Sequence, residues 1–300
     1  ASVIEAGNAS GGAALRQAYL AVASGAVETA MVVGVEKFSE HPTAEVEAAL
    51  ATSTDSDYEA VHGATPAAQA AMLMRRYLHT HSAPADALAG FPITAHANGA
   101  ANPNAMFRRA ISTEKYQRAG MVTDPMNMFD AAPLADGAAA VILARASALP
   151  ENILYPTVRI ASSAAATDTI AVHDRPDPLV FEAAALSSQQ ALARAGITTD
   201  MVDFFELHDM FSIYAALSLE AAGFCKSGEG WKMASDDKIS ISGPLPVCTA
   251  GGSKARGEVG AATGVYQAVE AVLQLQQRTP DSQVPEARIG MIQCLSNAAG

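Results

Sequence analysis

The chain has 300 residues, of which 50% are hydrophobic and 17% charged, and its formal net charge is −12. This length and apolar content suffice for one large or two ordinary domains. The acidic balance argues against nucleic acid and anionic membranes as partners, because both need a basic surface, although a local basic patch could still bind a small anion.

Three cysteines, Cys225, Cys248 and Cys294, are too few and too scattered for a disulfide framework or a zinc site. They are typical of buried thiols in a reducing compartment. No apolar run reaches the roughly 18 uncharged residues of a membrane span. No basic segment precedes an apolar stretch as in a signal peptide. The sequence therefore predicts a cytoplasmic protein without a metal.

The first element is a glycine-rich corner, GNASGG, which leads into an Ala- and Leu-rich helix and then a β-branched run at 29–35. That run predicts a buried strand. Such a corner points a side chain and free backbone N–H groups at whatever lies above the helix. A Cys or Ser would suit the place, but the residue is Asn8, which is neither a nucleophile nor a base.

Residues 40–121 are polar and Ala-rich, with helical stretches such as 64–76 and no strong strand, so they predict a long excursion from a sheet. We expect the histidines of this region to lie on solvated surface, since no pair has the spacing and carboxylate company of a metalloprotease helix. They are His41, His62, His79, His81 and His96.

Strand character returns at 138–144, after the turn at 135–137, and 149–152 reads as a linker. The sequence then predicts alternating elements: strands at 157–161, 201–207 and 288–295, and helices at 179–195 and 211–222. Apolar strands between amphipathic helices are typical of α/β layers. We expect two units, 1–150 and 151–300.

The two units resemble each other. GNASGGAALRQAYLAV near the start resembles GEVGAATGVYQAVEAV at 257–272, and an apolar strand follows each. If the halves are related, Asn8 and Glu258 occupy equivalent first positions of two buried helices. This echo would be weak evidence alone, but it coincides with the most unusual polar residues.

Two further stretches carry candidate chemistry. In ELHDMF, His208 ends a predicted strand, where α/β folds place ligand-facing residues, although a core or capping role is the alternative. In AGGSKARGE, a flexible basic loop containing Gly252 and Ser253 precedes a helix. This loop is either a solvated turn or the lining of a pocket for an anion or thioester.

Together, NASGGAALRQAYLAVASG, ANPNAMFRRAIS, DPMNMFDAAPLADGAAAVIL, ELHDMFSIYAALSLEAAGF and GGSKARGEVGAATG resemble the thiolase superfamily, specifically the sterol-carrier-protein type and archaeal acetyl-CoA acetyltransferases. The resemblance covers nearly the whole chain. It implies an α-β-α-β-α fold of two related halves with a loop domain inserted at about 40–121, and a homodimer. Family members continue beyond both ends of this sequence, so we expect a fragment or one piece of a split protein.

The resemblance also assigns site residues. Asn8 stands where the family has its acyl-accepting Cys, and Glu258 where the His of a Gly-His-Pro motif activates that Cys. His208 matches the His that positions the thioester oxygen, whereas Met210 replaces a proton-donating Cys. Cys294 lies near the family's second Cys, without the Gly of its Cys-x-Gly turn. Gly252 and Ser253 would contact the CoA thioester.

These departures leave several functions open. Without a nucleophile at position 8, Claisen-type thiolysis fails, but an aldol or retro-aldol step on an acyl-CoA of lipid metabolism needs only enolate stabilisation and a base. CoA would enter as substrate, with no other cofactor, and an OB-fold, zinc-ribbon protein is an implied partner. A non-catalytic acyl-CoA-binding or scaffolding subunit is the alternative. A substituted Cys in an ordinary thiolase is a third, which Met210 and Glu258 argue against.

For the enzyme, we expect the Asn8 amide to donate to the thioester oxygen and Glu258 to face it, with a pKa raised by burial. His208 would be the second donor to an enolate oxygen. The alternative is that Asn8 only caps its helix.

Overall fold

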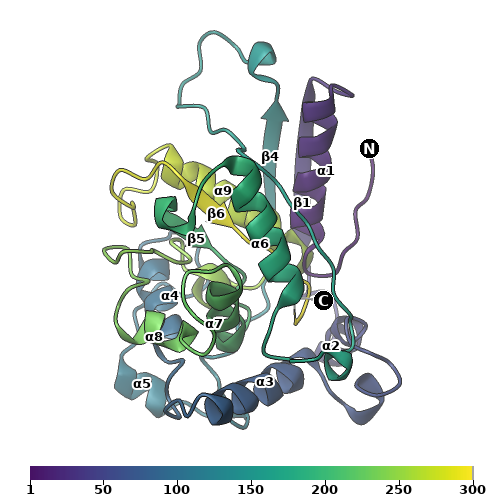
Figure 1. Cartoon of the computed structure of the whole chain (residues 1–300), viewed down its shortest axis with the longest axis vertical. Coiled ribbons are helices and arrows are strands. Elements are labelled where there is room, and N and C mark those ends of the chain that lie inside the picture. The colour runs from purple at the N-terminus through teal and green to yellow at the C-terminus, as the bar shows by residue number, and fades with distance from the viewer. Residues whose placement is uncertain (299–300) are drawn as a thin grey trace.

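The computed structural model describes residues 1–298; Ala299 and Gly300, which end the predicted second unit, lie outside the described residues. At one end of the molecule, α1 (Ser10–Ser24) stands beside β1 (Thr29–Glu36) and β4 (Gly137–Ala144), as Figure 1 shows. β1 and β4 pair antiparallel, with Val32 opposite Val141. The strands predicted at 29–35 and 138–144 are therefore confirmed. The predicted burial of 29–35 is wrong for one face, where Met31, Val33 and Val35 are 67%, 52% and 62% exposed.

Residues between β1 and β4 form the helical region at the opposite end of the molecule (Figure 1). Among the described residues it holds α2 (Thr43–Ala51), α3 (Pro66–Thr80), α4 (Gly90–Ala100), α5 (Thr113–Gln117), β2 (Met121–Thr123) and β3 (Met126–Asn127). The Thr65 hydroxyl accepts the Ala68 amide and so begins α3. The helix predicted at 64–76 is confirmed.

The second half contains α6 (Glu182–Ala195), β5 (Phe204–Glu206), α7 (Ser212–Ala221), α8 (Gly230–Ser235), α9 (Thr263–Leu275) and β6 (Gly290–Ile292). β5 and β6 pair in parallel. α7 is apolar on nearly every side, and its residues lie at the centre of the main hydrophobic core. The helices predicted at 179–195 and 211–222 are confirmed, as are shorter versions of the strands predicted at 201–207 and 288–295.

The strand predicted at 157–161 is wrong. No strand of the described chain pairs with this segment, and an apolar run becomes a strand only where a neighbour satisfies its backbone groups. The chain just after this segment is held by side chains rather than by a neighbouring strand: Arg16 and Arg194 donate to the Ser163 carbonyl at 2.6 and 3.1 Å.

The starts of α1 and α9 cross at glycines. A Cβ on Gly264 would lie 2.4 Å from the Gly12 nitrogen, and one on Gly11 would lie 2.8 Å from the Ala261 oxygen. Only glycine allows this approach. The two helices of the sequence echo therefore meet at their first turns, as expected for two related halves of an α/β fold. The division at residue 150 stays a prediction.

Within residues 1–298, no helix combines the length and the hydropathy needed to cross a bilayer. In the same part of the chain, no three His, Cys, Asp or Glu side chains converge as they would around a metal ion. The expectation that the histidines of residues 40–121 lie on solvated surface is wrong for His96. This side chain is buried and stacks on Phe107, with 5.6 Å between the ring centroids.

Candidate active site

His208 and Glu258 form a buried pair. His208 comes two residues after β5, and its Nε2 lies 3.2 Å from Glu258 Oε2. The other ring nitrogen, Nδ1, lies 3.0 Å from the Leu295 carbonyl oxygen, to which it donates. Thr263, the first residue of α9, donates its hydroxyl to Glu258 Oε1 at 3.0 Å. Since His208 and Glu258 are 1% and 0% exposed, water does not screen their interaction.

The charges of this pair correct one expectation. Burial alone would raise the pKa of Glu258, but the positive charge and hydrogen bond of His208 outweigh it, so the pKa is lowered. Burial likewise opposes protonation of His208, yet Glu258 raises its pKa. Two such groups titrate as a unit. The carboxylate of Glu258 and the protonated ring of His208 thus stabilise each other, and Glu258 is not the weakly acidic group that burial alone predicts.

Asn8 contacts Met210, two residues after His208, and does not cap its helix. The N-cap of α1 is Ala9, and no side chain caps this end, so the capping alternative is wrong. The Asn8 side-chain amide instead donates to the Met210 sulfur at 3.5 Å. A thioether is a weak acceptor, so an oxygen of higher charge could replace it.

Cys294 connects the corner to the buried pair. Its thiol donates to the Asn8 carbonyl at 3.4 Å, and Leu295, the next residue, accepts from His208. Burial raises the pKa of Cys294 to about 12. The thiol is therefore neutral at physiological pH and is no substitute for a thiolate nucleophile. The predicted residues Asn8, His208, Glu258 and Cys294 are thus brought together.

The basic loop at 250–258 is neither flexible nor solvated. It forms a buried π-helical turn, Gly252–Arg256. Lys254 donates to the Asp130 carbonyl at 2.6 Å, and Arg256 binds both oxygens of Glu270 at 3.0 and 2.9 Å. These cations serve internal partners rather than a bound anion, which corrects the anion-pocket interpretation.

Gly252 and Ser253 lie in this turn, against Asp209. The Ser253 amide donates to Asp209 Oδ1 at 2.6 Å, and a Cβ on Gly252 would lie 2.5 Å from Oδ2. Both residues are buried. Their contact with a CoA thioester stays a prediction.

Sequence reasoning missed three residues of the polar interior: Thr263, Glu206 and Glu270. Glu206 accepts the Thr249 amide and hydroxyl at 2.9 and 2.5 Å. Burial, helped by the charge of Glu270, raises the pKa of Glu206 to about 8. For Glu206 and Glu270, the signal in the sequence was a carboxylate inside an otherwise apolar strand or helix, because a buried carboxylate needs a polar partner.

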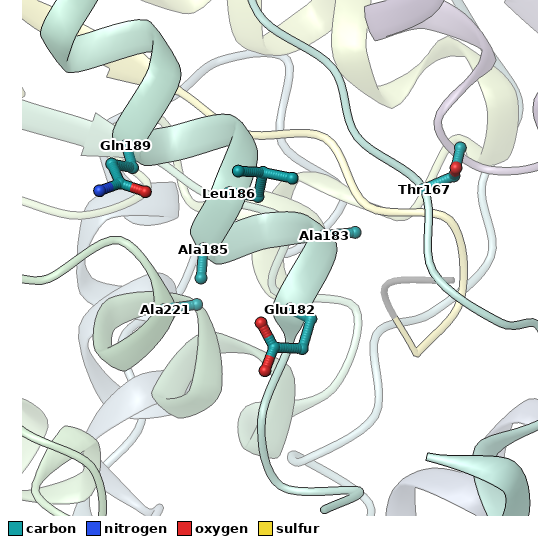
Figure 2. Close-up of a pocket in the computed structure, with 7 residues that line it drawn as sticks. All are labelled: Thr167, Glu182, Ala183, Ala185, Leu186, Gln189 and Ala221. Atoms are coloured by element: carbon teal, nitrogen blue, oxygen red, sulfur yellow. The ribbon is translucent and has the colours of Figure 1, made fainter. Parts of the chain in front are cut away.

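A separate open groove of about 370 Å³ lies along α6, away from this cluster. Figure 2 shows that it is lined by Thr167, Glu182, Ala183, Ala185, Leu186, Gln189 and Ala221. Glu182 is its sole ionisable side chain among these lining residues, so the groove offers no acid–base pair.

Two family models together match most of the chain. The family described as "Thiolase, N-terminal domain" matches residues 1–147, and "Thiolase C-terminal domain-like" matches 164–299. An acetyl-CoA acetyltransferase of Methanothermobacter thermautotrophicus is 38% identical over 99% of this chain and 77% of its own length. A 17-hydroxy-3-oxo-4-pregnene-20-carboxyl-CoA lyase of Mycobacterium tuberculosis is 28% identical, covering 89% and 72% respectively.

Among solved structures, a chain of "Ltp2-ChsH2(DUF35) aldolase" superposes with a TM-score of 0.82 at 24% identity. The match covers 96% of this chain and 74% of that one. This likeness shows the shared fold.

Proposed function

The chain belongs to the thiolase superfamily, and we propose that it forms or breaks a carbon–carbon bond in an acyl-CoA thioester without a cysteine acyl-enzyme. One observation carries this proposal: a buried His208–Glu258 pair is joined, through Met210 and the turn at 294–295, to a corner that holds Asn8. Acyl transfer through the enzyme needs a nucleophile at that corner. Acid–base chemistry does not.

A retro-aldol cleavage suits these groups. The β-hydroxyl of the substrate gives its proton to the pair, the Cα–Cβ bond breaks, and its electrons form a thioester enolate. Glu258 is ionised, as a base must be, and His208 and Thr263 occupy two of its roughly four acceptor positions. The Asn8 amide and the positive end of α1 stabilise the enolate oxygen. Return of the proton to Cα leaves a ketone or aldehyde and a shorter acyl-CoA.

The assembly belongs to the same proposal. The complex named in the similar aldolase structure supports a DUF35-type partner, which we take to be the OB-fold, zinc-ribbon protein. The family resemblance supports a homodimer, and the lyase relative supports a lipid-like acyl group. CoA enters as part of the substrate, with no further cofactor.

A non-catalytic acyl-CoA-binding subunit is the second candidate. It is favoured by the fact that both ring nitrogens of His208 already have partners inside the protein. Such saturation would suit a pair that only stabilises the fold.

The deciding experiment incubates the full-length protein, with and without a DUF35-type partner, with β-hydroxyacyl-CoA and 3-oxoacyl-CoA thioesters, with and without free CoA. We expect cleavage of β-hydroxyacyl-CoA that does not need free CoA, and no acyl adduct by intact-mass spectrometry. CoA-dependent thiolysis with an adduct would refute the proposal. Tight binding with no turnover would establish the second candidate.

A further inference from the structure

The turn that holds His208 is itself held by a buried side chain. Leu295 accepts from His208, and two residues later Asn297 adopts a left-handed φ of 36°, which Asn tolerates better than most residues. The Asn297 amide donates to Gln69 Oε1 at 2.8 Å. Its carbonyl oxygen accepts the Tyr214 hydroxyl at 3.2 Å. Asn297 therefore ties the turn to α3 and α7.

From Gln69 the contacts continue to a buried carboxylate. Gln69 Nε2 donates to Glu59 Oε2 at 2.7 Å. The other oxygen of Glu59 accepts the Val172 amide at 2.7 Å and lies 3.1 Å from His173 Nδ1. Glu59 is 7% exposed and Gln69 2% exposed. One set of polar groups thus connects three parts of the chain: the helical region, the 172–174 turn and the 294–297 turn.

The direction of these hydrogen bonds is set at one end. An ionised carboxylate can only accept, and burial of Glu59 is outweighed by its donors, which lower its pKa. Gln69 must therefore turn its NH2 toward Glu59 and its oxygen toward Asn297. Asn297 must then donate to Gln69 and accept from Tyr214. One charge thus orders two amides, and charge-assisted hydrogen bonds of this kind are the strong ones.

We propose that Glu59, Gln69 and Asn297 are positioning residues for the active site: they fix the 294–297 turn, hold the Leu295 carbonyl on His208 Nδ1, and so keep Nε2 aimed at Glu258. The kinetic part of this inference rests on the proposed function. The geometric part does not, because the orientation of His208 can be measured without turnover.

The test is Gln69→Met, which keeps the side-chain length but removes both hydrogen bonds. Gln274→Met is the matched control, since Gln274 is also buried and donates to the Ser282 carbonyl at 2.8 Å, near the far end of α9. Imidazole 15N NMR of the full-length protein follows His208, assigned by the loss of its signal in His208→Gln. We expect Gln69→Met to shift or broaden the His208 signals, and the control to leave them in place.

For turnover, we expect kcat of Gln69→Met to fall about ten- to a hundredfold, because small misplacements of reacting groups carry such costs. KM should change less than about threefold, since no substrate contact is removed. Unchanged His208 signals and unchanged kcat in a folded variant would overturn the inference. An inactive wild-type protein would defeat the proposed function, while the NMR comparison would still decide the positioning role.

Gln69→Glu is the second variant, in case the first does not fold. Its new carboxyl can donate to Glu59 only while protonated, so the His208 signals should match those of the wild type at low pH and depart from them as the pH rises. His208 signals that match those of the wild type at every pH would contradict the inference.

Discussion

Glu258→Gln isolates the charge of the buried pair. The substitution preserves the side-chain volume, and the amide oxygen can still accept from Thr263, which lies 3.0 Å from Glu258 Oε1. The amide nitrogen would face His208 Nε2, now 3.2 Å from Oε2. Because an amide NH2 only donates, His208 must release its Nε2 proton to accept it. An ion pair thus becomes a neutral hydrogen bond.

The size of the effect follows from this exchange. Removing one partner of a buried pair costs about 3–5 kcal/mol when the other charge stays. Here His208 can become neutral, because burial lowers its pKa once Glu258 is gone. The stability loss should therefore be nearer the roughly 1–3 kcal/mol of a weakened buried hydrogen bond. Loss of acid–base catalysis should reduce kcat about 10²- to 10⁴-fold, equivalent to about 3–5 kcal/mol.

The assay measures cleavage of a β-hydroxyacyl-CoA, calorimetric binding of an unreactive acyl-CoA, and thermal unfolding. We expect turnover to be lost while binding stays within about threefold, since the pair does not hold the CoA moiety. Glu206→Gln is the control. Glu206 is equally buried, and its pKa of about 8 keeps it protonated at pH 7, where Gln imitates it closely. A Glu258→Gln protein that cleaves at the wild-type rate would refute the catalytic role.

Three other outcomes follow. Asn8→Ala should weaken both acyl-CoA binding and turnover, by about three- to thirtyfold for one lost hydrogen bond; a change in thermal stability alone would show that the corner is only a turn. Gly264→Ala should lower the free energy of unfolding by about 1–3 kcal/mol despite better helix propensity, because its Cβ would meet the Gly12 nitrogen at 2.4 Å. The control is Gly120→Ala, which has open space around it. Its free energy of unfolding, measured by chemical denaturation, should stay within about 0.5 kcal/mol of the wild-type value. The pKa of Glu59 is lowered in the folded protein, so ionised Glu59 stabilises the fold above the pKa of the unfolded state, and this stabilisation disappears as the pH falls through the folded-state pKa. The free energy of unfolding of Glu59→Gln should therefore depend less on pH in acid than that of the wild type. An identical dependence on pH would contradict this.

The elements that were predicted well are those that patterning alone determines. The apolar, β-branched run at 29–35 and the helix ending at Gly196 were predicted from local signals: residue type for the strand, and for the helix the glycine that adopts a left-handed C-cap at φ 69°. The segment 157–161 also contains β-branched residues, yet forms no strand beside any described neighbour. Strand formation depends on a partner, and composition does not show one.

The motifs indicated which residues lie near one another, but their role as a catalytic site stays a prediction, and the electrostatics were not foreseen. Asn8, His208, Glu258 and Cys294 are brought together as the motifs indicated. The pKa of Glu258 could not be foreseen, because its partner lies 50 residues away and reverses the effect of burial. Lys254 was misread for the same reason, since a basic residue in a glycine-rich loop looks solvated until its internal acceptor is known.

The charge balance of the site relates Asn8 to Glu258. In the family pattern, position 8 supplies a thiol that must become an anion, and the residue at 258 is the base that makes it one. Here the anionic group is Glu258, whose pKa is lowered by His208 at 3.2 Å. Cys294 contacts Asn8 and lies within reach of the charge of Glu258, so a second anion at position 8 would repel that carboxylate. A neutral amide avoids this repulsion and still donates a hydrogen bond. On the proposed function, Asn8 and Glu258 are complementary: the carboxylate beside His208 is the base, and the neutral amide is the hydrogen-bond donor.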